Sequence, residues 1–134
     1  MRRRIIIHSR GHAAAALEAA ASLQRPVTLA SAPGAGAYGG PRWFLALVAE
    51  ASRAHPGAVF DAVVDCADEP GTVLAALRAG AARVRFGGGG EARQKLAAVA
   101  AELGAELEGE SEVPALDLLG EADPRAACRV YLAR

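Results

Sequence analysis

Short apolar runs alternate with alanine- and leucine-rich segments along most of this chain, and this alternation constrains the fold more than any other feature of the sequence. The first run, Ile5-Ile6-Ile7, is continuous and β-branched, which is typical of a strand buried on both faces of a parallel sheet. We predict strands at about Arg3–His8, Val27–Ser31, Val59–Cys66 and Ala82–Phe86, and a short fifth strand is one interpretation of Ala105–Leu107.

The segments between these runs place apolar residues at the i, i+3, i+4 and i+7 spacing of a helix that packs along one side. Pro41 suits the first position of a helix, and Gly80 suits the position just after one. The predicted helices run from about Gly11 to Gln24, from Pro41 to the His55-Pro56-Gly57 break, from Pro70 to just before Gly80, from Glu91 to Leu103, and onward from Asp123-Pro124.

Alternating strands and helices with short connections indicate a single α/β domain over residues 1–134, with a parallel, four- to five-stranded sheet of βα repeats. Two architectures agree with this pattern. One is a flavodoxin-like three-layer sandwich with strand order 2-1-3-4, and the other is a (β/α)4 half barrel with order 1-2-3-4. The buried character of the strands favours the sandwich. A half barrel would leave one face of its sheet open and could bury that face by dimerising.

The net charge, the apolar runs and the cysteines of the chain argue against several classes of partner. A formal net charge of zero over 134 residues argues against nucleic acid, which requires a basic surface. The longest apolar run is too short to cross a bilayer and no secretory signal is visible, so we expect no membrane partner and a cytoplasmic location. Cys66 and Cys128 do not form a close pair, which indicates reduced thiols rather than a disulfide framework.

Metal and cofactor chemistry are not indicated. His8 and His12 have the HxxxH spacing, but they straddle a predicted strand–helix junction and so do not share a helix face. Lys95, the only lysine, lies within a predicted helix, which excludes imine chemistry at a lysine borne on a strand. We therefore predict neither a metal site nor a bound cofactor.

The first of two glycine-rich turns follows the second predicted strand. Its Gly34-x-Gly36-x-x-Gly39 spacing resembles a Rossmann nucleotide-binding turn. It differs from that turn because Pro41 begins the helix only after the third glycine, and because it follows the second strand rather than the first. We interpret the segment as a lid in which Gly34, Gly36 and Tyr38 contact a ligand.

The second turn, Gly87-Gly88-Gly89-Gly90, runs directly from a predicted strand into a predicted helix. Its position resembles the phosphate-binding turns found late in (β/α) barrels. In such turns, backbone N–H groups approach the anion and the start of the helix adds a partial positive charge. We predict that Gly87, Gly88, Gly89 and Gly90 bind a small anion.

Polar residues also follow the other predicted strands, at the edge where parallel α/β proteins bind ligands. His8 ends the first strand and Ser9 follows it, Ser31 ends the second, and Asp65 lies at the end of the third. In the 2-1-3-4 order, His8 would lie between Ser31 and Asp65, an arrangement that suits acid–base catalysis.

Three functions follow from these features. The leading hypothesis is a domain that binds a small anionic or phosphorylated ligand at the carboxyl ends of its strands. The second is an assembly subunit without catalysis, which forms a homodimer through alanine-rich helix faces and an arginine-bearing edge strand. The third is a small enzyme that uses His8 and Asp65 for proton transfer.

Overall fold

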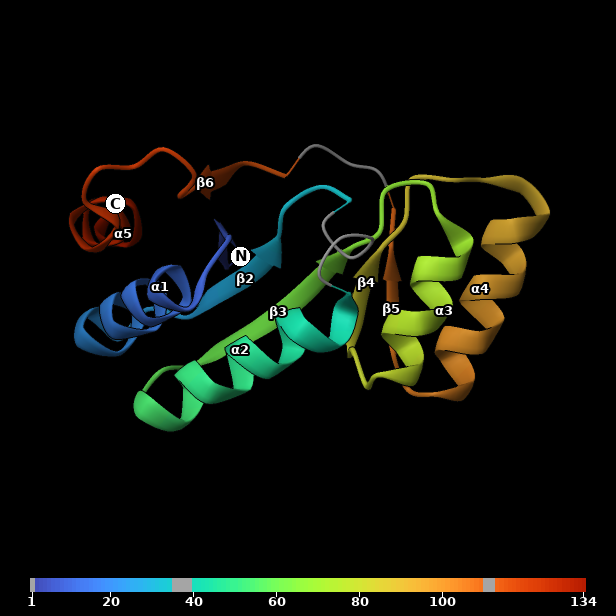
Figure 1. The fold of residues 1–134 in the computed structure, drawn as a ribbon, viewed down its shortest axis with the longest axis horizontal. Helices are drawn as coiled ribbons and strands as arrows, with labels where there is room; N and C mark the ends of the chain where they lie inside the picture. The colour runs from blue at the N-terminus through green and yellow to red at the C-terminus, as the bar shows by residue number, and fades with distance from the viewer. Residues whose placement is uncertain (1, 35–39, 110–112) are drawn as a thin grey trace. The chain divides into compact units, whose positions relative to one another are not determined.

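The computed structural model describes residues 2–34, 40–109 and 113–134, and it shows an α/β chain (Figure 1). Within these residues there are six strands: β1 (Arg3–Ile7), β2 (Val27–Ser31), β3 (Phe60–Asp65), β4 (Arg83–Arg85), β5 (Glu106–Glu108) and β6 (Ala115–Asp117). The same residues form five helices: α1 (Arg10–Leu23), α2 (Pro41–Ala54), α3 (Pro70–Arg78), α4 (Gly90–Glu102) and α5 (Pro124–Ala133). The predicted α/β class is confirmed, but the sheet formed by the described residues has six strands where four to five were predicted.

The strand order corrects the favoured architecture. The strands follow one another as β5-β4-β3-β2-β1-β6, so the first four have the sequential order of the half-barrel alternative. The 2-1-3-4 order of the flavodoxin-like sandwich is wrong. The pairs β1–β6, β3–β4 and β4–β5 are parallel, as predicted for βα repeats. Neighbours in the sequence are thus neighbours in the sheet, except that β6 pairs with β1.

Internal contacts divide the described residues into two compact units. Unit 1 draws on residues 1–30, 46–61 and 113–134, and unit 2 draws on residues 31–45 and 62–112. β2, β3 and α2 contribute residues to both units. β1, β6, α1 and α5 belong to unit 1, and β4, β5, α3 and α4 belong to unit 2.

Unit 1 is packed around α1, whose inner side is almost entirely alanine. α5 lies beside α1 (Figure 1), and α1 also contacts β1. Small side chains allow this close approach, and each contributes little burial energy by itself. The buried residues of α1 and α5 are Ala13, Ala15, Ala16, Leu17, Ala19, Ala20, Cys128 and Leu132.

In unit 2, α3 and α4 contact each other, and each packs on a strand, α3 on β4 and α4 on β5 (Figure 1). The alternating arginines of this strand indicate either an edge strand or a half-exposed one. β4 lies between β3 and β5, so the edge-strand alternative is wrong, whereas the partial exposure of Arg83 and Arg85 agrees with a half-exposed strand. The alternation of charged and apolar side chains along β4 has a different cause. Val84 is fully buried, whereas Arg83 and Arg85 pair with acidic residues on neighbouring strands.

The predicted helix starts are largely confirmed because they depend on local chemistry. α2 begins at Pro41, and α5 begins at Pro124 with the Asp123 carboxylate accepting a hydrogen bond from the N–H of Ala126. None of the helices in residues 2–34, 40–109 and 113–134 combines the length and apolar character needed to cross a membrane.

Candidate ligand site at the carboxyl ends of strands β3 and β4

A cavity of about 360 Å³ opens in unit 2 where β3 and β4 end. It is lined by Pro33, Asp65, Ala67, Asp68, Arg85 and Gly87. Its wall therefore combines two carboxylates, one guanidinium and backbone groups of three connecting segments. This is the edge of a parallel sheet at which ligands of α/β proteins bind.

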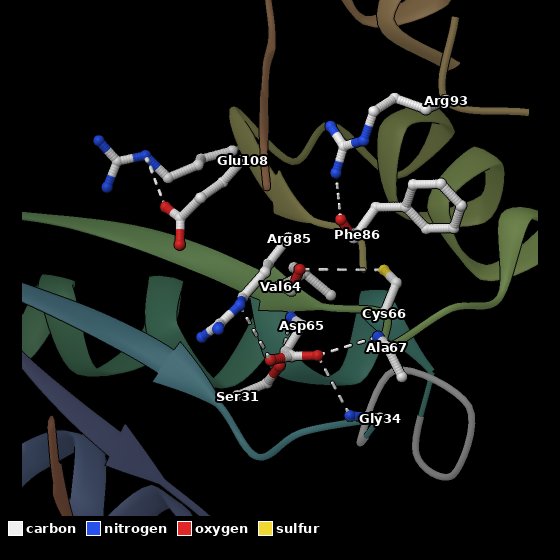
Figure 2. A network of polar contacts seen from close by, with 11 residues as sticks. Ser31, Gly34, Val64, Asp65, Cys66, Ala67, Arg85, Phe86, Arg93 and Glu108 are labelled. Atoms are coloured by element: carbon white, nitrogen blue, oxygen red, sulfur yellow. Dashed lines mark hydrogen bonds and ion pairs between the residues drawn. The ribbon is translucent and has the colours of Figure 1, made fainter. Parts of the chain in front are cut away.

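Asp65 organises this wall (Figure 2). Its Oδ1 accepts hydrogen bonds from the N–H of Ala67 at 2.9 Å and the N–H of Gly34 at 3.4 Å. Its own N–H donates to Ser31 Oγ at 2.8 Å, and its Oδ2 lies 4.0 Å from Arg85 Nε. One carboxylate thus fixes the connections that follow β2 and β3 and faces the end of β4.

The predicted site residues Ser31, Gly34, Asp65 and Gly87 are brought together here. Ser31 is buried, and its hydroxyl oxygen accepts a hydrogen bond from the N–H of Asp65. It therefore fixes the backbone of Asp65 without lining the cavity itself. The N–H of Gly87 donates to the carbonyl of Ala67 at 2.7 Å, which ties the two connections together. All four therefore have hydrogen bonds within the protein that explain their positions without a ligand.

The four-glycine turn is shaped by Phe86 and Arg93. The Arg93 guanidinium donates to the carbonyl of Phe86 (Figure 2) and to that of Gly88 at 2.9 Å. Its Cζ lies 5.6 Å from the centroid of the Phe86 ring, within range of a cation–π contact. A Cβ on Gly88 would lie 2.3 Å from Cζ of that ring, so any other residue at position 88 would displace the ring or the turn. Gly89 is the N-cap of α4. Among the described residues, the N–H groups of Gly88 and Gly89 have no hydrogen-bond partner.

His8 belongs to a different cluster, in unit 1. Its Nε2 lies 2.6 Å from Oδ1 of Asp117, which follows from the pairing of β1 with β6. Its backbone N–H donates to Nδ1 of His12, and the two imidazole rings meet edge to face. Ser9 is the N-cap of α1 and accepts from the N–H of His12.

The proposed pairing of His8 with Asp65 depended on the 2-1-3-4 order. β1 and β3 are not neighbours in the sheet, so that argument no longer holds. Asp117 gives His8 an orienting carboxylate, as a general base requires. However, neither residue lines the cavity in unit 2. The roles of His8 and Asp65 in catalysis stay a prediction.

Two groups of this cluster have a pKa below the usual value. Burial lowers the pKa of His12 most, and the neighbouring His8 lowers it further. Burial acts to raise the pKa of Asp117, but the N–H of Leu119 and the His8 side chain outweigh it, so the pKa falls. Both groups therefore resist protonation in the folded state.

We expect the free energy of unfolding to fall as the pH is lowered. His12 contributes stability above its ordinary pKa of 6.5, and this contribution is lost as the pH falls through its lower folded pKa. Asp117 adds a second loss below its ordinary pKa of 3.8. Urea unfolding at pH 7.5 and pH 5.5 measures the first loss. His12→Asn should reduce the difference between the two pH values, whereas His55→Asn should leave it in place; an equal effect of both would contradict the assignment.

Gly36 and Tyr38 lie outside the described residues, so the lid and the resemblance to a Rossmann turn stay predictions. Arg85 was missed, although it directly precedes the Phe86–Gly90 segment and alternates with Val84. Asp68 follows the third predicted strand at the expected edge of the sheet, but nothing in the sequence selects it as a site residue. Asp117 was missed because a three-residue strand gives almost no periodic signal.

Cys66 and Cys128 are both unbridged and buried. Burial raises the pKa of Cys66 to about 12 and that of Cys128 to about 11, so neither thiol is activated as a nucleophile. Within residues 2–34, 40–109 and 113–134, no group of three or more His, Cys, Asp or Glu side chains is placed to hold a metal ion.

No protein-family model matches the chain, and no curated protein matches it either.

Proposed function

We propose that unit 2 is a binding domain for a small molecule that carries one anionic group, such as a phosphate or a carboxylate. The observation that carries this proposal is the 360 Å³ cavity with Arg85 in its wall, at the carboxyl ends of β3 and β4. A guanidinium presents several donors in a fixed plane and can bind an anionic group through two parallel hydrogen bonds. The N–H groups of Gly88 and Gly89, which have no hydrogen-bond partner among the described residues, follow at the end of the same strand.

The carboxylates of Asp65 and Asp68 narrow the class of ligand. With one cation and two anions in the wall, a polyphosphate would meet strong repulsion. Hydroxyl or ammonium groups would instead donate to the carboxylate oxygens. The ligand that fits is small, carries a single anionic group and has several hydrogen-bond donors, as a sugar phosphate or an amino acid does.

Arg85→Gln tests this proposal. We expect it to weaken ligand binding roughly 10- to 100-fold, because a charge-assisted hydrogen bond contributes about 1.5–3 kcal/mol. The measurement is calorimetry with those sugar phosphates and amino acids that raise the melting temperature of the wild-type protein, with inorganic phosphate as the minimal probe.

Arg83→Gln is the matched control. Arg83 lies two residues earlier on β4 and pairs with Glu106 and Glu108, but it does not line the cavity. We expect it to leave affinity unchanged within about twofold, since a surface ion pair contributes little. The proposal fails if no compound stabilises the wild-type protein, or if both substitutions weaken binding equally.

A further inference from the structure

α5 has two apolar sides, and α1 covers only one of them. Cys128 and Leu132 are buried in unit 1, and Arg125 and Arg129 of the same helix bind Glu18 of α1. The side of α5 turned away from Cys128 and Leu132 carries residues that lie three or four positions apart and so share one helix face. They are Ala126, Ala127, Val130, Tyr131 and Arg134.

This second side forms a groove of about 430 Å³ together with Leu116 of β6 and the turn before α5. Val130 lies in the groove and is 57% exposed, and Leu119, which follows β6, is 69% exposed. β6 is the last strand in the sheet order, so its outer edge has no neighbouring strand among the described residues. Exposed apolar side chains beside an open strand edge are typical of an interface.

The charges of the groove are separated along the helix. Glu121 and Asp123 lie at the end where α5 begins, and Arg134 lies at the other end. Arg3 and Arg25 both donate to the carbonyl of Arg134, which adds positive charge at that end. A partner that matches this groove must present the opposite order of charges, with small or apolar residues between them.

We propose that the partner is a second copy of this chain, bound with the two α5 helices antiparallel about a two-fold axis. In that arrangement the acidic end of each helix faces the basic end of the other, and the groove is complementary to itself. Ala126 and Ala127 let the two helix backbones approach closely, while Val130 of each copy lies near the axis. This interface is independent of the ligand site proposed in unit 2.

Val130→Glu tests the apolar centre of the interface. The wild-type protein should sediment as a dimer, and the substitution should raise the dimer dissociation constant at least ~30-fold, the equivalent of an interface residue worth 2 kcal/mol. Leu103→Glu, at a residue that is also 57% exposed but lies beside α4 in unit 2, should leave the dimer intact. Circular dichroism confirms that each variant is folded.

A charge swap tests the antiparallel geometry. Glu121→Arg and Arg134→Glu should each weaken self-association, because each places like charges opposite one another at both ends of the interface. Mixing the two variants should restore dimers, since every facing pair is then opposite in charge. The proposal is overturned if the wild-type protein is a monomer at ~1 mM, well above the dissociation constants of specific dimers. A dimer that survives Val130→Glu, or variants that fail to associate when mixed, would overturn it equally.

Discussion

Asp65→Ala should lower the free energy of unfolding by about 2–3 kcal/mol, because a largely buried carboxylate that accepts backbone hydrogen bonds is removed and its donors are left without a partner. Those donors are the N–H groups of Ala67 and Gly34. The Asp65 side chain is 13% exposed, so water replaces the lost oxygen poorly. Urea unfolding measures the loss, and calorimetry with a ligand found for the wild-type protein measures its effect on the cavity.

Asp68 provides the control for this experiment. It lines the same cavity, but its side chain is exposed and makes no hydrogen bond within the described residues. Asp68→Ala should therefore alter ligand affinity while changing stability by less than about 0.5 kcal/mol. Asp65→Asn should recover most of the stability, because an amide oxygen can accept the same two N–H groups. If Asp65→Ala and Asp68→Ala have equal effects on stability, Asp65 does not hold the turns as described.

Gly88→Ala should cost about 1–3 kcal/mol of stability, as is usual when atoms are forced into a packed core. The added Cβ would meet three ring atoms of Phe86 at 2.3, 2.8 and 3.0 Å, and the ring is confined by burial and by Arg93. The ring or the β4–α4 turn must move, and either movement reshapes the wall of the cavity beside Gly87. Chemical unfolding gives the stability, and ligand affinity reports the change in the wall.

Gly89→Ala is the neighbouring control, since a Cβ at residue 89 meets nothing within 4 Å. It should cost less than about 1 kcal/mol, the usual difference between glycine and alanine at an N-cap. A double-mutant cycle identifies the cause: Gly88→Ala should be less costly in a Phe86→Leu background, where the ring is absent. An equal cost in both backgrounds would show that backbone conformation, and not the ring, requires glycine.

Local chemistry made the elements predictable, whereas the sheet order depends on interactions far apart in the sequence. Pro41 and Asp123-Pro124 mark helix starts by their own geometry. The continuous Ile5-Ile6-Ile7 run was interpreted as burial on two faces, which favoured the sandwich. In the structure, Ile6 is only half-buried, and Arg4, two residues earlier on the same face of β1, is a buried charged residue. This face of the strand is therefore not buried among apolar side chains alone.

The site was predictable in part for the same reason. Asp65 and Gly87 follow from the rule that ligands bind where parallel strands end, and that rule needs no strand order. Arg85 was missed because alternating arginines indicate only an edge strand or a half-exposed one, and neither interpretation points to a ligand. Arg85 faces the Asp65 carboxylate only because β3 pairs with β4 in a register that sets the two residues side by side, and that pairing is not readable from the sequence of β4 alone.

The pairing of β6 with β1 has a consequence for the order in which the chain folds. Unit 2 is encoded within residues 31–112, so all of it is synthesised before β6 and α5. Unit 1 must wait for residues 113–134 before β1 gains β6 as its second neighbouring strand and α1 packs against α5, and closing so long a loop is entropically costly. Unit 2 is thus expected to fold first during synthesis, while the alanine-rich side of α1 stays exposed until the final segment emerges.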